Sequence, residues 1–291
     1  MNQAPPRTAG EVLARSRAFL AAKAVEGGRL DAELLVAESL GLDRLGLFMA
    51  LDRPVVPAEI DKARDLVVRR AGGEPTAYIL GFREFYGRRF SVDRRVLIPR
   101  PETELVVDLA RKHLEDWSAE DGPRVVDLGA GSGCLGLTLA LEVESARVVA
   151  LELAPQAAEV VRANAEALEV PKERFGLHVG DGLAWLRARG GIDLLVSNPP
   201  YIDPAQPDGL DPAVRASEPA EALFAPAGDP DHFARILFEN RAALLAPGGR
   251  AFVELGFDQA ERLAPLLEAN ADATVHADLE GTPRVFEFGP A

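Results

Sequence analysis

The sequence predicts an α/β protein in which a mostly parallel sheet, covered by helices on both faces, follows a smaller helical domain. Three changes of pattern predict it. Residues 8–71 place apolar side chains at helical spacing, residues 81–98 are typical of a β-hairpin, and short β-branched runs alternate with helical stretches from residue 102 onward. We therefore expect an N-terminal helical domain at residues 1–80, a β-hairpin linker at 81–98 and an α/β domain at 99–291.

The N-terminal region contains four helical segments. Thr8 and Glu11 have the spacing of a capping box, so the first helix begins there. The later segments end at glycines or begin at proline, and they cover residues 31–40, 42–51 and 57–72. No catalytic constellation occurs here.

The second half contains seven strand-like runs, at residues 124–128, 147–152, 176–181, 193–197, 250–255, 274–279 and 284–288. Helices are expected at 105–114, 135–141, 155–168 and 232–245. The turn at 280–282 is too short for a crossover helix, so the last two strands must pair antiparallel. Six parallel strands and one antiparallel strand form the class I, Rossmann-like methyltransferase fold.

Composition limits the class of protein. The 291 residues are 47% hydrophobic and 27% charged, as in globular proteins, and no apolar run reaches the roughly 18 residues of a membrane span. The N-terminus lacks the apolar stretch of a signal peptide. The single cysteine, Cys134, excludes an internal disulfide and fits a reducing compartment. We expect a cytoplasmic protein without membrane contact.

Charge is distributed unevenly. Residues 1–85 hold 12 basic and 12 acidic side chains, whereas residues 86–291 hold 20 and 34 and thus supply the whole net charge of −14. This balance argues against nucleic acid as the main substrate, because binding it requires an excess of Lys and Arg. Residues 83–100 are a local exception, with six arginines and two acids, and form either a solvated hairpin face or a docking patch for an acidic partner.

A glycine-rich loop, VVDLGAGSGCLG at residues 125–136, follows a strand and opens a helix. Its last part matches the dinucleotide fingerprint, so a dinucleotide site is one alternative. A turn with a purely structural role is another. The acid two residues before the first glycine disfavours a pyrophosphate and suits the ammonium group of S-adenosylmethionine. The candidate cofactor residues in this loop are Asp127, Gly129, Ala130, Gly131, Ser132 and Gly133.

Two further acids follow the second and third strands. Glu152 lies about 20 residues beyond the glycines, where a carboxylate can accept both ribose hydroxyls. Its alternative role is a helix N-terminal acid. Asp181 ends the third strand, where it can accept the adenine amino group.

The most specific motif is Ser-Asn-Pro-Pro-Tyr at residues 197–201, after an apolar strand. Prolines remove backbone donors, so the neighbouring carbonyls can face a ligand. The side-chain oxygen of Asn198 and the carbonyl of Pro199 can together accept both hydrogens of a target –NH₂ group and aim its lone pair at a methyl donor. Tyr201 is expected to pack on the flat target group. The alternative is an ordinary proline turn.

Other features are expected to be structural. The four histidines show no metal-ligand spacing, and we expect no metal. Residues 199–230 contain eight prolines and little periodicity. A loop of this length is usually functional, and we expect it to cover the target site.

The residues Arg83–Glu104, the loop DLGAGSG, the NPPYI run and the closing DLEGTPRVFEFG resemble the HemK/PrmC family over essentially the whole chain and in the same order. The segment LIPRPETE at residues 97–104 distinguishes this family from other NPPY proteins. Its members are protein-(glutamine-N5) methyltransferases that modify class I peptide-chain release factors, which supports translation termination.

The resemblance implies S-adenosylmethionine as cofactor, bound by Gly129 to Gly133 and Glu152, and by Asp181, Gly182 and Asn198. It implies that Asn198, Pro199, Pro200 and Tyr201 hold the substrate glutamine and that the helical domain at residues 1–80 docks the release factor. We further expect Arg100 and Glu102 to contact the substrate, and we expect the chain to be a monomer. There are two departures. Glu152 stands where relatives more often have Asp, and Gly182 where they often have a bulky side chain beside the adenine, which leaves stacking there open.

Two rival functions use the same motifs. An adenine-N6 methyltransferase of DNA or RNA also acts on a flat –NH₂ group, but the acidic catalytic half and the lack of a basic recognition domain disfavour it. A catalytically inactive binding module is disfavoured by the intact Asn198 and Tyr201.

Overall fold

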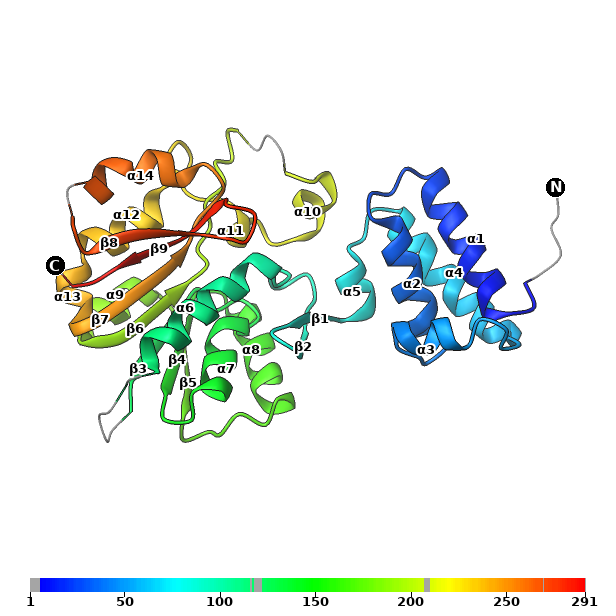
Figure 1. Ribbon diagram of the computed structural model, residues 1–291, viewed down its shortest axis with the longest axis horizontal. Helices are drawn as coiled ribbons and strands as arrows, with labels where there is room; N and C mark the ends of the chain where they lie inside the picture. Colours follow the sequence, from blue (N-terminus) through cyan, green and yellow to red (C-terminus); the bar gives the residue numbers. More distant parts are fainter. Residues whose placement is uncertain (1–5, 116, 118–121, 207–209, 269, 291) are drawn as a thin grey trace. The chain divides into compact units, whose positions relative to one another are not determined.

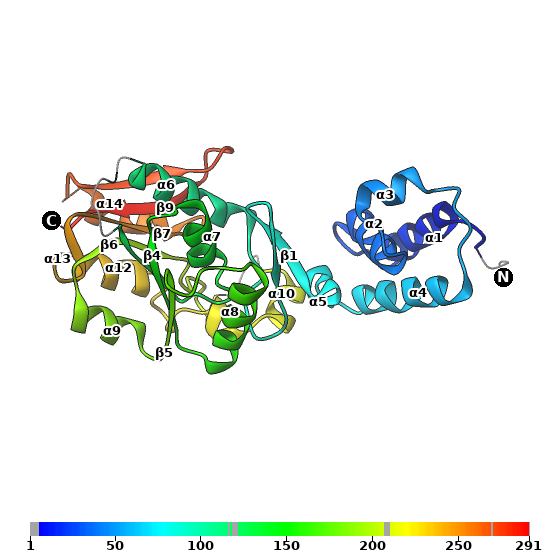
Figure 2. The same cartoon turned by 90° about the horizontal axis from the view of Figure 1, so that it is seen from below.

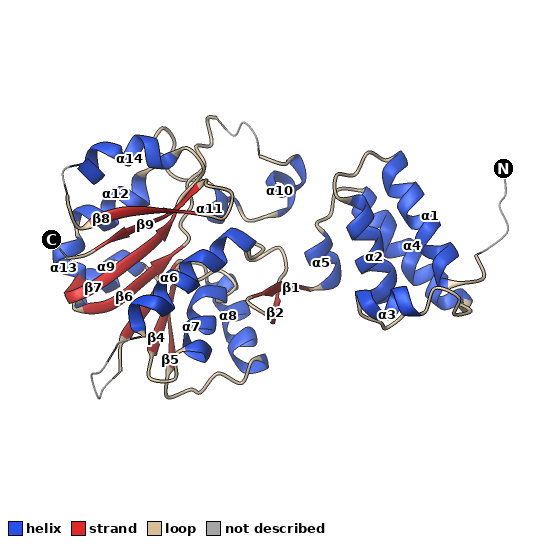
Figure 3. Ribbon diagram, in the orientation of Figure 1, coloured by secondary structure: helices blue, strands red, loops and turns tan. Residues whose placement is uncertain are grey.

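The structure is a computed structural model that describes residues 6–115, 117, 122–206, 210–268 and 270–290. The chain divides into two compact units. The first contains the described residues of Met1–Gly81 together with Asp211–Ser217, and the second contains those of Phe82–Leu210 and Glu218–Ala291. Figure 3 shows that the first unit is helical, whereas the second contains the large sheet.

Helices of the first unit, drawn as ribbons in Figure 2, share one apolar core in which Leu20, Leu35 and Leu47 are fully buried; residues 212–217 contribute no buried side chain to it. Its helices are α1 (Ala9–Ala22), α2 (Gly28–Ser39), α3 (Arg44–Met49), α4 (Pro57–Ala71), α5 (Thr76–Leu80) and α10 (Pro212–Ser217). The helices expected between residues 8 and 71 are confirmed. The capping box is displaced by one residue: Thr8 Oγ1 accepts the Glu11 N–H at 3.3 Å, but the Glu11 carboxylate accepts the N–H of Arg7 at 2.7 Å.

The second unit begins with the predicted β-hairpin, formed by β1 (Phe82–Phe85) and β2 (Arg88–Ser91). Tyr86 and Gly87 both have positive φ, 50° and 72°, as a two-residue type I′ turn requires. Phe85 and Phe90 are buried and join the core of the large sheet. The short helix η1 (Pro101–Thr103) follows and leads into α6 (Glu104–Leu114).

The large sheet has seven strands in the order β5-β4-β3-β6-β7-β9-β8 (Figure 1). They are β3 (Arg124–Leu128), β4 (Arg147–Glu152), β5 (Phe175–Val179), β6 (Ile192–Ser197), β7 (Leu245–Glu254), β8 (Ala273–Ala277) and β9 (Pro283–Phe288). Strands β3 to β7 pair in parallel, and β9 pairs antiparallel with both β7 and β8. This arrangement confirms the predicted fold class.

Helices cover both faces of the sheet. On one side lie α6, α7 (Cys134–Glu142) and α8 (Pro155–Ala167), and on the other α9 (Gly182–Arg189), α12 (His232–Glu239), α13 (Arg241–Leu244) and α14 (Gln259–Glu268) (Figure 1). Neighbouring residues of a strand serve opposite cores: Val125 packs with α6 and α7, and Val126 with α9 and α12. Double burial explains why these strands are continuously apolar in sequence.

The sequence did not predict α9, α14 or the four-residue α11 (Ala220–Leu223). Helix α14 has Pro265 in its interior, and two residues separate α9 from β5, a strand that we expected to continue to Asp181. None of the described helices is long and apolar enough to cross a membrane. The parallel strands place their carboxyl ends at one edge, where Leu128, Glu152, Ser197 and Glu254 end β3, β4, β6 and β7. In open α/β sheets this edge holds the ligand.

Candidate active site

A cavity of about 460 Å³ opens at this edge, and its walls come entirely from the second unit. The loops after β3, β4, β5 and β6 form most of it, and residues from the 95–103 segment and from 219–222 complete it. Most of the predicted site residues line it: Asp127, Gly129, Ala130, Gly131, Ser132, Glu152, Asp181, Gly182, Asn198, Pro199 and Pro200. Gly133, Arg100, Glu102 and Tyr201 do not.

The glycine loop curls back on the end of β4. The N–H groups of Gly129 and Ala130 donate to the carbonyl of Leu151 at 2.9 and 3.2 Å. Gly129 and Gly131 have φ of 74° and 57°, a region where a side chain is strained, and they leave the cavity floor as bare backbone. Gly133 caps α7 instead, and a Cβ there would lie 2.9 Å from the Leu137 side chain.

Asp127 lies beneath this loop with 1% of its surface exposed. Its Oδ2 accepts the N–H of Gly136 at 2.8 Å, in the first turn of α7, and a Cβ at residue 136 would lie 2.9 Å from that oxygen. The last glycine of the apparent dinucleotide fingerprint therefore makes room for an acid. Burial raises the pKa of Asp127 to about 7. A cation placed in the cavity would therefore stabilise the ionised form of this carboxyl group and lower its pKa.

Glu152 closes the loop from the end of β4. Its Oε2 accepts the N–H of Gly131 and its Oε1 that of Ala154, both at 2.8 Å. Only 8% of the residue is exposed. A carboxylate oxygen has two lone pairs, so each can accept a second hydrogen bond, as from a sugar hydroxyl.

Asp181 and Gly182 form the wall at the start of α9. Asp181 is the N-cap residue, and its Oδ1 accepts the N–H of Ala184 at 3.0 Å. A Cβ on Gly182 would lie 2.4 Å from Leu128 Cδ1. Packing of Leu128 against the backbone thus accounts for glycine at the position where stacking was left open.

The NPP turn forms the opposite wall. Ser197 Oγ donates to the carbonyl of Leu128 at 2.7 Å, which ties the end of β6 to the start of the glycine loop. Asn198, Pro199 and Pro200 then line the cavity. The Tyr201 ring does not line the cavity and lies against Gly256, where a Cβ would come within 2.9 Å of it. Its predicted packing on the target group stays a prediction. Burial raises the pKa of Tyr201, so its hydroxyl stays protonated.

Two family models match the chain: the PrmC N-terminal domain over residues 11–81 and the methyltransferase small domain over residues 106–214. The release factor glutamine methyltransferase of Chlorobaculum tepidum is 41% identical over 274 residues, 92% of each chain. That of Geobacter sulfurreducens is 39% identical over 280 residues, 96% of this chain and 95% of its own. The chain belongs to the release factor glutamine methyltransferase family. The predicted family is thereby confirmed.

Solved structures agree on the fold of this family member. The catalytic domain of hMettl16 is similar with a TM-score of 0.55 and 16% identity, over 78% of this chain and 82% of that one. Human methyltransferase 10 domain containing protein gives a TM-score of 0.51 at 13% identity, over 71% and 91%. At such identities the likeness shows the class I methyltransferase fold and no more.

The cavity of this release factor glutamine methyltransferase family member fits S-adenosylmethionine. It has the size of a small-molecule site and a bare backbone floor. Asp127 and Glu152 line this cavity with buried carboxyl groups, and their predicted contacts with the methionine ammonium and the ribose stay predictions. S-adenosylmethionine is the cofactor of this family member.

Four buried polar residues of this site were missed in the sequence. Asn164 of α8 is fully buried, and its amide donates to the carbonyls of Ser91 and Ser132, which joins the hairpin to the glycine loop. Thr103 and Glu254 meet at 2.6 Å beside Asn198. The fourth, Glu218, pairs with Arg100. For Glu254, a carboxylate ending an apolar strand at the ligand edge was a readable signal; for Asn164 there was none.

Arg100 is held away from the cavity. Its Nη2 lies 2.6 Å from Oε1 of Glu218, whose side chain is fully buried and whose Oε2 accepts the Ile98 N–H at 3.0 Å. Other arginines of the 83–100 stretch also pair within the second unit, as in Arg88 with Glu142 and Arg95 with Asp93. Ion pairing therefore explains a large part of this basic stretch. The predicted substrate contacts of Arg100 and Glu102 stay predictions.

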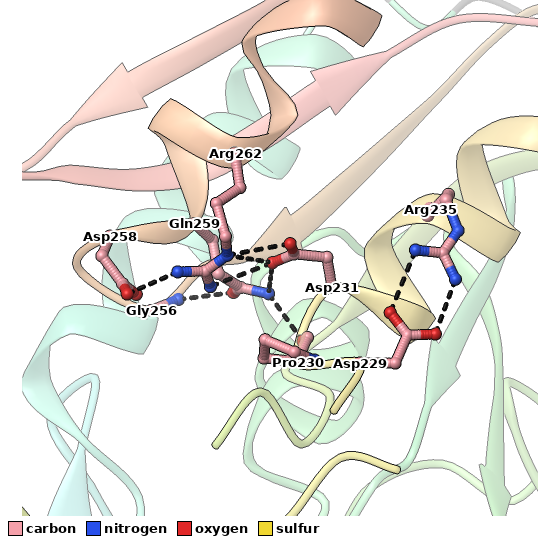
Figure 4. Close-up of polar contacts among 8 residues, drawn as sticks. All are labelled: Asp229, Pro230, Asp231, Arg235, Gly256, Asp258, Gln259 and Arg262. Atoms are coloured by element: carbon pink, nitrogen blue, oxygen red, sulfur yellow. Dashed lines mark hydrogen bonds and ion pairs between the residues drawn. The ribbon is translucent and has the colours of Figure 1, made fainter. Parts of the chain in front are cut away.

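The proline-rich segment after the NPP turn is anchored at both ends. Ile202 exchanges backbone hydrogen bonds with Leu223 and Ala225. At the other end, Figure 4 shows Gln259, which accepts the Gly256 N–H at 2.7 Å and donates to the Pro230 carbonyl at 2.9 Å and to Asp231. Further ion pairs there join Arg262 to Asp231 and Asp258, and Arg235 to Asp229. The end of the segment is thus fixed beside the wall that holds Tyr201; its predicted role as a cover stays a prediction.

Proposed function

We propose that this chain transfers the methyl group of S-adenosylmethionine to the side-chain amide nitrogen, N5, of a glutamine in class I peptide-chain release factors, and so supports translation termination. The relatives in this family are named release factor glutamine methyltransferases. The observation that supports the assignment best is that one cavity contains both the glycine loop and the Asn198–Pro200 turn. Donor and acceptor sites therefore share one space.

The donor side binds by charge and backbone. Asp127 attracts the methionine ammonium, Glu152 accepts the ribose hydroxyls, and Asp181 accepts the adenine amino group. Gly129 to Gly133 let the backbone approach the ligand closely. When bound, S-adenosylmethionine supplies an electrophilic methyl group on a sulfonium. The protein itself has only to hold this group in line with the acceptor nitrogen.

The acceptor side recognises a primary amide. Asn198 Oδ1 and the Pro199 carbonyl accept its two hydrogens, which directs the nitrogen lone pair at the methyl group and stabilises positive charge as it develops. Pro200 contributes an apolar wall, and Tyr201, which follows it in the chain, is proposed to pack against the flat target group. No strong base is required, because the methylated nitrogen loses its proton readily afterwards.

The helical unit, residues 1 to about 80, is proposed to read the protein substrate, with Arg100 and Glu102 contacting it near the cavity. A single glutamine side chain offers few contacts, so specificity for one protein requires binding energy from a remote surface. The helical unit has no part in the cavity, and it matches the PrmC N-terminal domain. We also propose that the chain acts as a cytoplasmic monomer without stable nucleic-acid binding, in keeping with its net charge of −14.

Product detection tests this function. Full-length enzyme and S-adenosylmethionine are incubated with a purified release factor, and separately with DNA and RNA oligonucleotides, and each substrate is measured by intact mass. We expect the release factor alone to gain the mass of one methyl group. Methylated adenine with an unmodified release factor would replace this function with that of an adenine-N6 methyltransferase.

A further inference from the structure

A chain of three polar side chains leads from the sheet core to the cavity. Glu254 ends β7 and is 3% exposed, and Thr103 of η1 is 1% exposed. Thr103 Oγ1 lies 2.6 Å from Glu254 Oε2, and Asn198 Nδ2 lies 3.2 Å from Thr103 Oγ1. Three segments distant in sequence thus converge on the carboxamide that faces the cavity.

Hydrogen-bond capacity determines the direction of this chain. A hydroxyl has one proton to donate, and a carboxylate can only accept. Thr103 therefore donates to Glu254, and its oxygen is left as an acceptor for Asn198. Asn198 must present its Nδ2 to Thr103, so its Oδ1 points away from Thr103.

We propose that Thr103 and Glu254 are positioning residues, which hold the Asn198 carboxamide with its Oδ1 turned to the amide hydrogens of the substrate glutamine. The inference rests on the proposed function of Asn198, and it names two residues that act through it. Neither Thr103 nor Glu254 needs to touch the substrate glutamine for this role.

The carboxamide needs such a device because its two ends have nearly the same shape. The terminal torsion of asparagine is broad and roughly two-fold, so rotation about it exchanges Oδ1 and Nδ2 at little steric cost. In the reversed orientation, Nδ2 would face the –NH₂ group of glutamine, and two donors would meet. A fixed acceptor on the other side, Thr103 Oγ1, selects the productive orientation.

The charge state of Glu254 supports the same reading. Burial raises its pKa to about 7, Glu102 raises it further, and Arg284 and Arg100 act in the opposite sense. Tyr201 and Cys134 also face it and are neutral, since burial raises the pKa of both. Ionised Glu254 forces Thr103 to donate to it. Protonated Glu254 can itself donate to Thr103, which frees the Thr103 proton to donate to Asn198 Oδ1, so the reversed carboxamide is no longer disfavoured. Acidification below about pH 7 should therefore lower kcat at saturating substrates.

Substitution of Thr103 in the full-length enzyme tests the role. Thr103→Val keeps the shape and removes the hydroxyl, and we expect kcat to fall about 10- to 100-fold, as for residues that orient a ligand-binding group. The Kd of S-adenosylmethionine should change less than about twofold. Thr103→Ser restores the hydroxyl and should recover most of the activity. Thr138→Val is the matched control, because Thr138 is fully buried and its hydroxyl has no hydrogen-bond partner among the described residues.

Glu254→Gln tests the pH dependence. Glutamine can accept from or donate to Thr103 but does not titrate, so kcat should be lower than that of the wild type at pH 8 and flat between pH 6 and 8. A wild-type pH profile in Glu254→Gln would contradict the role of Glu254. Wild-type kcat in folded Thr103→Val would overturn the role of Thr103.

A spectroscopic measurement separates this inference from the proposed function. In the wild-type enzyme, the Nδ2 protons of Asn198 should show a nuclear Overhauser contact to the Thr103 methyl group, and the contact should weaken in Glu254→Gln. If the enzyme leaves release factors unmethylated, the proposed function fails, but this contact still decides the orientation of Asn198. Absence of the contact in the wild type would overturn the inference by itself.

Discussion

The two ends of the cavity each hold a buried carboxyl group, but the hydrogen-bond donor to that carboxyl group is of a different kind at each end. Each has a buried carboxyl whose pKa is raised to about 7: Asp127 at the end proposed to hold the cofactor, here called the cofactor end, and Glu254 at the end proposed to hold the target amide, here called the target end. Asp127 is satisfied by a backbone N–H nine residues away, that of Gly136. Glu254 is satisfied by the side chain of Thr103, 151 residues away.

The two ends therefore differ in whether backbone atoms or individual side chains maintain their geometry. Backbone donors at the cofactor end are supplied by the path of the glycine loop, so they remain when neighbouring side chains change. At the target end, the orientation of Asn198 depends on individual side chains from η1 and β7. Single substitutions should therefore affect the rate most at the target end, and affinity or stability at the cofactor end.

The largest effect is expected for Asn198→Ala. Loss of the side-chain acceptor should lower kcat by about 10²-fold or more, by analogy with removal of one oxyanion-hole donor, while cofactor affinity changes little. Steady-state kinetics on the release factor and a cofactor titration measure the two quantities. Asn240→Ala is a suitable control, because its amide donates to the Ile236 carbonyl and the residue does not line the cavity. Near-wild-type turnover of Asn198→Ala would remove the proposed mechanism.

Glu152→Ala should act on affinity instead. It removes acceptors for the ribose and also leaves the N–H groups of Gly131 and Ala154 without a partner. We expect binding of S-adenosylmethionine to weaken by roughly 2–3 kcal/mol. Calorimetric titration tests this, with the exposed Glu159→Ala as control. An unchanged Kd would reduce Glu152 to an acid at the start of a helix.

Substitutions in the helical unit should change KM for the protein substrate and leave methylation of a short peptide unchanged. Leu45 and Met49 lie one turn apart on α3 and are 69% and 82% exposed. If this face reads the release factor, the double substitution of both residues to Glu should raise KM for the intact factor about tenfold. A short glutamine peptide should be methylated as by the wild type. An unchanged KM for the factor would exclude this face as the reader.

The smallest effect concerns stability. The pKa of Asp127 is raised from 3.8 to about 7 in the folded protein. Between these values the folded state keeps a proton that the unfolded state has lost, so stability falls as pH rises through this window and stays reduced above it. Asp127→Asn keeps an acceptor for Gly136 and removes the penalty. A shift of this size corresponds to at most about 4 kcal/mol. The asparagine amide that replaces the carboxyl is also buried and offsets most of this, so we expect a net gain of about 1 kcal/mol and a rise in Tm of about 2–4 °C at pH 8.

Scanning calorimetry at pH 8 and pH 4 checks this sign, with the exposed Asp65→Asn as control. The gain at pH 8 should nearly vanish at pH 4 and should be accompanied by weaker cofactor binding. If Asp127→Asn were equally or less stable than the wild type at pH 8, the buried, ionised Asp127 would not destabilise the folded protein, which contradicts this account.

The fold could be predicted because its signals are local. Doubly buried strands are continuous apolar runs, and the turn at residues 280–282 was short enough to fix the antiparallel pairing of β9. Helix α9 was missed because the strand was extended to Asp181, which caps the helix instead. Helix α14 was missed because it contains Pro265, a residue typical of helix ends.

The site divides in the same way. The glycine loop and the NPP turn are each one short continuous segment of sequence. Their predicted residues line the cavity, apart from Gly133 and Tyr201. Thr103 and Glu218 could not be found, because each is defined by a partner more than one hundred residues away. Glu254 gave a signal as a carboxylate at the end of an apolar strand, but its pairing with Thr103, 151 residues away, could not be predicted. Arg100 looked like a ligand-binding cation, and only the fold shows that Glu218 holds it.

The claim that this cavity acts on a primary amide is tested most directly by locating the methyl group. A release factor methylated by the full-length enzyme is digested, and fragmentation mass spectrometry assigns the modified atom. We expect the methyl group on the side-chain amide nitrogen of one glutamine, and none on a factor in which that glutamine is replaced by glutamate. Methylation of another residue type, or undiminished methylation of the glutamate variant, would contradict the account.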